Sequence, residues 1–287
     1  FKQKTAYEIG VRLVGSEMCI RDRVGKFADH LPLYRQSEIY ARSGLDLPRS
    51  TLADWVGGSA WLLEPLVEAI GRHVFAGPAI HTDDTPVPVL DPGRGRTKTG
   101  RLWTYVRDER PWGSTAPPAA FFRYTPDRKG ERPQAHLQSF AGFLHADAYA
   151  GYDKLYTDEN GAAGAITEVA CWAHARRGFH DVFVATKAPL AEEALKRIAE
   201  LYAVEDEANG RPPEQRTALR QEKAKPCVEA FHTWLTTTLP KLSAKSELAK
   251  AISYALTHWT ALTRYLDDGR LGIDNNPVAV SYTHLTL

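Results

Sequence analysis

The stretch Ala79–Leu90, "AIHTDDTPVPVL", places two adjacent acids, Asp83 and Asp84, among β-forming residues. Aspartate is disfavoured inside strands, so these acids need a reason to be there. A second apolar run, "FLHADAY" at 143–149, ends on Asp147 just before a predicted helix. Two acids on two strands of one sheet can converge on a divalent cation such as Mg²⁺, which takes carboxylate oxygens. The open alternative is that these acids cap helices or face solvent.

The segments around the acids predict a mixed α/β sheet. Short β-rich runs at 79–90, 101–108 and 119–126 are separated by glycine and proline. A strand, a helix and another strand then follow over 142–174. Antiparallel strands followed by a strand–helix–strand unit indicate a mixed sheet within an α/β fold.

The chain turns helical after about residue 175. Apolar residues recur at helical spacing in two stripes, which are Leu195, Ile198 and Tyr202, then Leu248, Ile252, Leu256 and Trp259. Pro226 is expected to break the segment between the stripes. The run Asp267–Gly269 is expected to stop the second helix.

Residues 24–58 predict a helix-turn-helix segment. A helical pattern over 30–42 is followed by turn residues at 43–50 and by a second helix that Ser50 can cap. A plain helical hairpin fits the same pattern. A further helix within 59–77 is expected to link this segment to the first strand.

The bulk composition fits a soluble globular protein, with 43% hydrophobic and 25% charged residues. No run approaches the roughly 18 apolar residues of a membrane span, so no membrane partner is expected. The three cysteines are widely separated, which favours a reducing cytoplasm over a disulfide framework. The net charge of +1 gives no hint of a nucleic-acid partner.

The two ends differ from the body. Residues 1–23 show no clear helical or strand period, and 280–287 carry no charge. Both resemble translated sequencing-adapter peptides, so we expect them to be artefacts and exclude them from functional reasoning. The only methionine is Met18 and the chain begins with Phe1, so we expect a fragment truncated on both sides.

Two further motifs carry charge. "RGRTKTGR" predicts a basic loop that can follow a nucleic-acid backbone, through Arg94, Arg96, Lys98 and Arg101. A solvated hairpin tip fits that loop equally well. "CWAHARR" at 171–177 offers Cys171 and His174, but a structural zinc site usually needs four ligands, so a buried strand cysteine is favoured. His174, Arg176 and Arg177 open the next predicted helix, where they can point at phosphate.

Several long blocks, in order, resemble the insertion sequence 66 family of bacterial transposases. They include "ADHLPLYRQSEIYARSGLDLPRSTLADWVG", "HTDDTPVPVLDPGRGRTKTGRLWTYVRDERPWG", "HADAYAGYDKLY", "CWAHARRGF" and "GRLGIDNNPV". The likeness runs from about Val24 to Val278.

The resemblance implies a ribonuclease H-like catalytic core at 78–182, an α-helical insertion at 183–269 and the start of a third-acid motif at 270–279. An Asp-Asp-Glu triad would hold two Mg²⁺ ions, with Mn²⁺ as a possible substitute. Asp83 and Asp147 match the first two metal-binding acids, and Asp84 matches a position where the family usually has another acid. The third acid falls on Ala279.

The implied function is metal-dependent cleavage and strand transfer of DNA at the ends of a mobile element, a DNA recombination carried out in the cytoplasm. DNA ends and target DNA are the expected partners, with self-association on DNA. Arg49 and Ser50 are expected to contact DNA from the helix-turn-helix segment. Because Ala279 carries no carboxylate, we expect this chain to be inactive. The alternatives are a DNA-binding remnant without catalysis and a two-metal nuclease acting on RNA–DNA hybrids.

Overall fold

A computed structural model of the chain describes residues 17–91, 93, 95–157 and 163–283. The chain divides into two compact units, one ending at Ala69 and the other beginning at Ile70. Each unit is described by itself. None of the helices in the described ranges is both long and apolar enough to cross a membrane.

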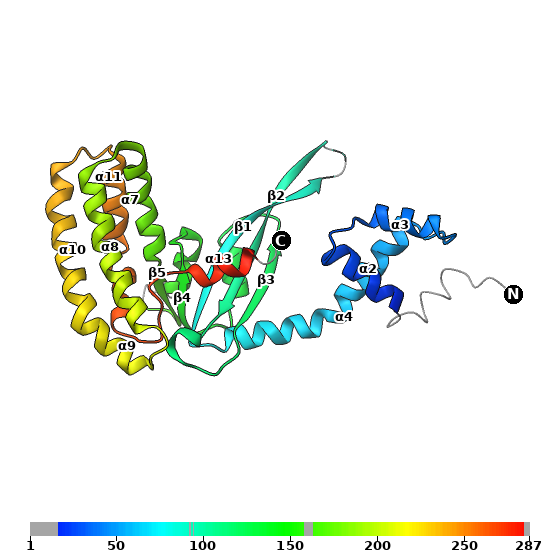
Figure 1. The fold of residues 1–287 in the computed structure, drawn as a ribbon, viewed down its shortest axis with the longest axis horizontal. Coiled ribbons are helices and arrows are strands. Elements are labelled where there is room, and N and C mark those ends of the chain that lie inside the picture. Colours follow the sequence, from blue (N-terminus) through cyan, green and yellow to red (C-terminus); the bar gives the residue numbers. More distant parts are fainter. Residues whose placement is uncertain (1–16, 92, 94, 158–162, 284–287) are drawn as a thin grey trace. The chain divides into compact units, whose positions relative to one another are not determined.

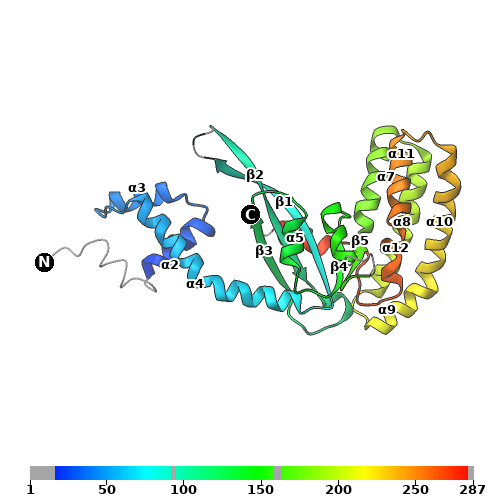
Figure 2. The same ribbon diagram turned by 180° about the vertical axis from the view of Figure 1, so that it is seen from behind.

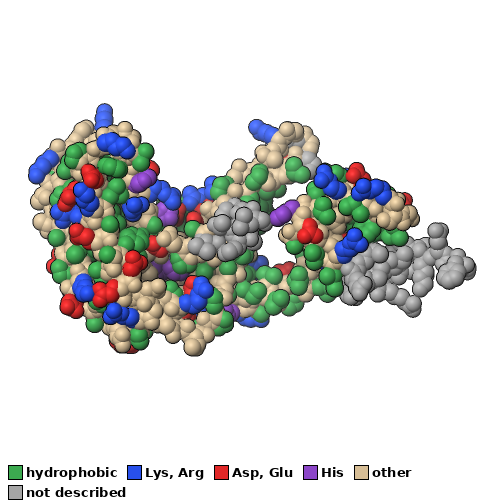
Figure 3. Space-filling model, viewed as in Figure 1, with side chains coloured by type: hydrophobic (Ala, Val, Ile, Leu, Met, Phe, Trp, Pro, Cys, Tyr) green, Lys and Arg blue, Asp and Glu red, His purple; other side chains and the backbone are tan. Residues whose placement is uncertain are grey.

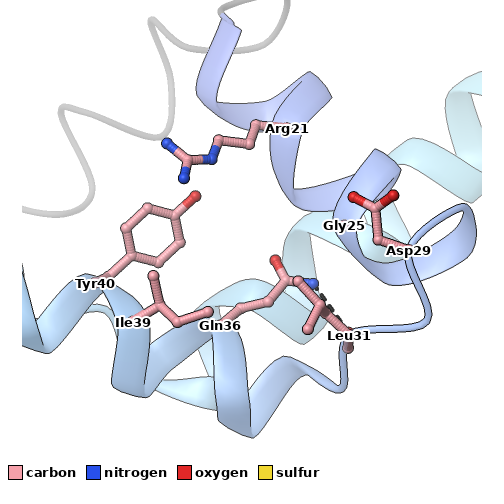
Figure 4. A pocket seen from close by; sticks show the side chains of 7 residues that line it. All are labelled: Arg21, Gly25, Asp29, Leu31, Gln36, Ile39 and Tyr40. Carbon is pink, nitrogen blue, oxygen red and sulfur yellow. Dashed lines mark hydrogen bonds between the residues drawn. The ribbon is translucent and has the colours of Figure 1, made fainter.

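From residue 17 on, the amino-terminal unit contains the helices α2 (Glu17–Phe27), α3 (Leu33–Arg42) and the first part of α4 (Arg49–Phe75) (Figure 1). Polar contacts hold α2 to α3. The Gln36 amide donates to the carbonyls of Asp22 and Leu31, both at 3.1 Å, and the Tyr40 hydroxyl donates to the Asp22 carboxylate. A small pocket of about 150 Å³ lies between the two helices, lined by Gln36 and Tyr40 among others (Figure 4).

The helix α4 differs from the sequence prediction in two ways. It already begins at Arg49, so Ser50 lies in its first turn and does not cap it. It is also one continuous helix of 27 residues, which includes most of the helix expected separately at 59–77. Glycines such as Gly57 lower helix propensity by only about 1 kcal/mol each, so the apolar residues that follow can still extend the helix.

The carboxy-terminal unit contains one five-stranded sheet in the order β3-β2-β1-β4-β5. Its strands are β1 (Ala79–Asp91), β2 (Arg96–Arg107), β3 (Ala119–Thr125), β4 (Gly142–Ala146) and β5 (Ile166–Ala170). The first three pair antiparallel, whereas β4 pairs parallel to both β1 and β5. The predicted mixed α/β sheet is therefore confirmed.

The two faces of the sheet are covered differently. Ile80, Trp103, Tyr105 and Leu144 belong to a buried apolar core on one face, where the ring of His136 at the end of α5 (Glu131–His136) meets the rings of Trp103 and Tyr105. Figure 2 shows α5 in front of the sheet, whereas Figure 1 shows α13 (Asn276–Thr283) over the opposite face. The two faces of β1, the strand that carries Asp83 and Asp84, are therefore in different environments, one beside the apolar core and α5 and the other beside α13.

A helical block follows β5 and packs on it through a second core that includes Val169 and Ala170. Its helices are α7 (Trp172–Thr186), α8 (Pro189–Ala208), α9 (Pro213–Leu219), α10 (Lys225–Thr238), α11 (Glu247–Thr257) and α12 (Trp259–Thr263). The short α6 (Asp153–Tyr156) lies between β4 and β5. Figure 3 shows acidic and basic side chains interspersed over the block, as expected of a solvated surface.

The expected break at Pro226 is wrong. Residues Arg220–Ala224 form a π-helical turn that leads directly into α10, and Pro226 lies in the first turn of α10. Because the helix continues across this point, Pro226 removes one hydrogen-bond donor and its ring crowds the preceding turn. The wider π-helical turn absorbs the irregularity, and the chain stays helical.

A buried ion pair connects this turn to the segment that leads back to the sheet. The fully buried Arg220 guanidinium donates to both carboxylate oxygens of Glu205, each at 2.7 Å. It also donates to the carbonyls of Tyr265 and Leu271, at 2.7 and 2.9 Å. Arg220 thereby fixes the chain that enters the "GIDNN" segment.

Candidate active site

Asp83 lies on β1, and Asp147 follows directly after β4, the strand that pairs parallel with β1. The register pairs Ala79 with Phe143 and His81 with His145. Continued by two residues, it brings Asp147, directly after β4, level with Asp83 on β1. The strand ends there because the chain turns at Ala148, which has a φ of 61°. The Tyr149 amide donates to Oδ1 of Asp147 at 3.2 Å and fixes this turn.

Asp83 and Asp84 point to opposite faces of the sheet, because successive side chains on a strand alternate. The Asp84 side chain is only 2% exposed and lies on the face of Trp103, its cross-strand partner. Arg101 donates to its Oδ2 at 3.0 Å, and Nε of Arg128 donates to its Oδ1 at 2.8 Å. Asp84 is therefore bound by two guanidinium groups on the face opposite Asp83, and one of them, Arg128, also reaches Oδ2 of Asp147 with its Nη2 at 3.6 Å.

The Asp83 carboxylate is destabilised where it lies. Burial, followed by the negative charge of Asp147, raises the pKa of Asp83 from 3.8 to about 6. The amide of Asp84, which donates to Oδ1 of Asp83 at 2.8 Å, offsets only part of this effect. A buried carboxylate whose pKa is raised by a neighbouring carboxylate is a group that a bound cation would stabilise.

The "GIDNN" segment lies against the same strand. The Asn275 side chain donates to the carbonyl of Thr82 at 2.8 Å, and its oxygen lies 3.1 Å from Nδ1 of His81. The backbone N–H of Asn275 donates to the sulfur of Cys171 at 3.2 Å. The helix α13 follows and packs against β1 and β2. Ala279, where the resemblance places the third acid, is an exposed residue of this helix.

His174 lies near Asp147, the second acid of the pair. It is half-buried near the start of α7, and burial lowers its pKa, whereas the charges of Asp147 and Asp274 act to raise it. Arg176 and Arg177 follow on the same helix with exposed side chains. The sequence prediction that α7 begins with a cluster of polar and basic groups is met, and His174 is the member that faces acids.

Cys171 is a buried residue at the end of β5, as the sequence favoured. Burial raises the pKa of its thiol to about 11, so it remains protonated at neutral pH. Within the described residues, no group of three or more His, Cys, Asp or Glu side chains is arranged to hold a metal ion.

The expected basic loop is shorter than predicted. Arg96, Lys98 and Arg101 belong to strand β2, where Arg96 and Lys98 are exposed and Arg101 pairs with Asp84. Arg94 lies outside the described residues. In the other unit, Arg49 and Ser50 are exposed at the beginning of α4.

Two residues of the site were missed by the sequence analysis. Arg128 lies in a turn between β3 and α5, and nothing local in "TPDRKG" indicates that its side chain reaches Asp84. Asn275 was noticed only as part of a motif, whereas its contacts with β1 depend on the return of a chain segment across the sheet.

The geometry defines a mixed α/β protein in which Asp83 and Asp147 lie on the same side of the sheet. A helical block separates β5 from the "GIDNN" segment, which packs against β1. The model of the family described as "Transposase IS66 family" matches residues 14–279. The chain belongs to this family, which confirms the resemblance seen in the sequence. The match begins before Val24 and includes residues of α2.

Two relatives come from Sinorhizobium fredii (strain NBRC 101917 / NGR234). "Uncharacterized protein y4hP" is 42% identical over 263 residues, which are 88% of this chain and 47% of the relative. "Uncharacterized protein y4qI" is 39% identical over 257 residues, which are 89% of this chain and 48% of the relative. The chain thus spans about half the length of the curated relatives it matches.

Proposed function

We propose that this chain carries the catalytic core of a DNA transposase that cleaves and transfers DNA strands with the help of divalent metal ions. The observation that carries the proposal is that Asp83 on β1 and Asp147, directly after the parallel strand β4, lie close enough for the charge of Asp147 to raise the pKa of Asp83. The strand order β3-β2-β1-β4-β5 supports a ribonuclease H-like core. Family membership supports a transposase role.

Asp83 and Asp147 would hold the metal, which we take to be Mg²⁺, with Mn²⁺ as a substitute. Their carboxylate oxygens are the ligands that hard cations prefer. A pair of such ions activates a nucleophile and stabilises the leaving oxygen of the DNA phosphate. The residues present supply two of the three acids, since Ala279 offers a methyl group. We therefore propose that the chain as it stands binds metal weakly and does not cleave DNA.

DNA is the proposed partner, with self-association on DNA as a further part of the proposal. Arg96 and Lys98 on β2 and Arg176 and Arg177 on α7 are exposed cations of the unit that carries the acids. We assign them, with His174, to contacts with the phosphate backbone. The helix pair α3 and α4, with Arg49 and Ser50, is the proposed helix-turn-helix segment of the other unit.

Metal binding tests the site without requiring activity. Mn²⁺ titrated into the chain should give an electron paramagnetic resonance signal of bound metal. Asp83→Asn and Asp147→Asn should each weaken this binding at least tenfold, whereas Asp84→Asn should not. If both variants bound Mn²⁺ as the parent chain does, the proposed site would be wrong.

A second candidate function is that of a DNA-binding remnant, which the alanine at position 279 favours. Plasmid nicking in Mg²⁺ separates the two functions. We expect no nicking by the parent chain and nicking by Ala279→Glu that disappears when Asp83→Asn is added. Nicking confined to RNA–DNA hybrids, without strand joining, would instead favour a nuclease.

A further inference from the structure

Asp84 combines burial with an unusual number of cationic partners. Its side chain is 2% exposed, and it accepts hydrogen bonds from Arg101 and from Arg128. Arg101 already neutralises the buried Asp84 carboxylate, and Arg128 adds a second guanidinium that also forms an ion pair with Asp147 at 3.6 Å. Charges away from solvent are costly unless they are paired and hydrogen-bonded, so these carboxylates hold both arginines in place.

Arg128 is held in one position by three contacts. Its Nε donates to both oxygens of Asp84, at 2.8 and 3.1 Å. Its guanidinium lies 4.0 Å from the centre of the Tyr149 ring, and the Tyr149 hydroxyl donates to its backbone carbonyl. Its side chain is nevertheless 36% exposed. The guanidinium is therefore rigid and accessible at once.

Both guanidinium groups keep donors for a further anion. Asp84 takes Nη1 of Arg101 and Nε of Arg128. Among the described residues, the two terminal nitrogens of Arg128 make no hydrogen bond, although Nη2 lies 3.6 Å from Oδ2 of Asp147. The planar fork of an arginine suits two oxygens of one phosphate.

We infer that Asp84 is a positioning residue that holds Arg101 and Arg128 as a pair for binding a phosphate of the DNA strand next to the Asp83–Asp147 pair. This inference rests on the proposed function. It assigns the two adjacent acids of β1 to different tasks, one on each face. Asp83 binds the metal, and Asp84 positions the two arginines that bind the phosphate backbone. Arg128, close to both Asp84 and Asp147, links the two tasks.

The test is the salt dependence of DNA binding, measured by fluorescence anisotropy with a fluorescein-labelled duplex of mixed sequence. Each phosphate contact that is lost lowers the slope of log K against log salt by about 0.9. Arg101→Gln and Arg128→Gln should each lower the slope by about one unit. Arg128→Lys should retain the slope, because a lysine still binds phosphate as a point charge. Each single replacement leaves Asp84 one guanidinium, which protects the fold.

The matched control is Arg211→Gln, an arginine on the helical block that pairs with Glu207 and is 42% exposed. It removes the same charge and should leave the slope unchanged. Asp84→Asn should lower the slope while leaving Mn²⁺ binding intact, which a metal ligand would not do. If the parent chain binds the duplex and both glutamine variants keep its slope, the inference is overturned and the proposed function stands. If the parent chain binds no duplex even at low salt, the proposed function itself fails.

Discussion

The Asn275 side chain donates a 2.8 Å hydrogen bond to the carbonyl of Thr82, although 193 residues separate the two. Thr82 directly precedes Asp83, and α13 begins directly after Asn275. The Asn275 side chain thus connects the segment that leads into α13 with β1, the strand that carries Asp83. Because its nitrogen donates to Thr82, its oxygen must accept, so His81 carries its proton on Nδ1.

Asn275→Ala should lower the free energy of unfolding by about 2–3 kcal/mol, because it leaves the Thr82 carbonyl and the His81 ring without partners in a buried place. Urea titration followed by circular dichroism measures this loss. The exposed neighbour Asn276 provides the control, and Asn276→Ala should cost no more than about 0.5 kcal/mol. Equal losses in the two variants would contradict the connecting role of Asn275.

The pKa of Asp83 predicts how stability depends on pH. The folded pKa of about 6 lies above the unfolded value of 3.8, so the fold disfavours the charged form. The parent chain should therefore lose stability as the pH rises through this interval, and Asp83→Asn should not. After allowance for solvent screening, the difference at neutral pH should be about 1–2 kcal/mol in favour of the variant.

Thermal melts of both proteins in a metal-free chelating buffer, at a series of pH values, measure this difference. Asp147→Asn removes the negative charge that, after burial, raises the pKa of Asp83. The stability of this variant should therefore depend on pH less steeply than that of the parent chain. Parallel curves for the parent chain and Asp83→Asn would show that Asp83 titrates normally.

Arg220→Met should destabilise the helical block by about 3–5 kcal/mol, because it removes both 2.7 Å hydrogen bonds to Glu205 and those to the carbonyls of Tyr265 and Asp268, and leaves Glu205 only the longer 3.4 Å contact with Arg216. Chemical unfolding measures the loss. Lys223→Met is the matched control, since Lys223 pairs with Glu207 at 2.7 Å on the surface. An exposed pair of this kind contributes at most about 1 kcal/mol. A loss below that value at Arg220 would mean that the ion pair is dispensable.

Ala148→Gly should raise the free energy of unfolding by about 1 kcal/mol, because an alanine in the left-handed region is strained and a glycine is not. Ala146→Gly, two residues earlier in β4, should instead lower it, since that alanine is buried in regular strand conformation. A lower melting temperature for Ala148→Gly would show that the methyl group of Ala148 contributes packing that outweighs the strain.

The mixed sheet and the acid pair could be predicted from the sequence, because alternation of apolar residues and misplaced aspartates are local signals. Asp83 and Asp147 stand out within their own strands, and the parallel pairing of β1 with β4 then brings them level. Local patterns suffice where a residue's role follows from the strand that carries it.

Other features depend on contacts that no local pattern encodes. Arg128 reaches Asp84 across 44 residues, and its own turn resembles any charged surface turn. The continuity of the chain through Pro226 follows from a π-helical turn, whose wider hydrogen bonding is not visible in residue types. The sequence predicts Arg96 and Lys98 in a loop, whereas pairing with β1 extends the strand β2 to include them.

Because Asp83 and Asp84 point to opposite faces of the sheet, the number of β1 residues that precede them cannot change by one. A single inserted residue between Ala79 and Asp83 would turn every later side chain of the strand to the other face. Asp84 would lose its arginines and Asp83 its neighbour Asp147, even though no functional residue had been replaced. Insertions at the far end of the hairpin, beyond Asp91, would leave both acids where they are. The spacing in this short segment is thus as much a part of the site as the carboxylates themselves.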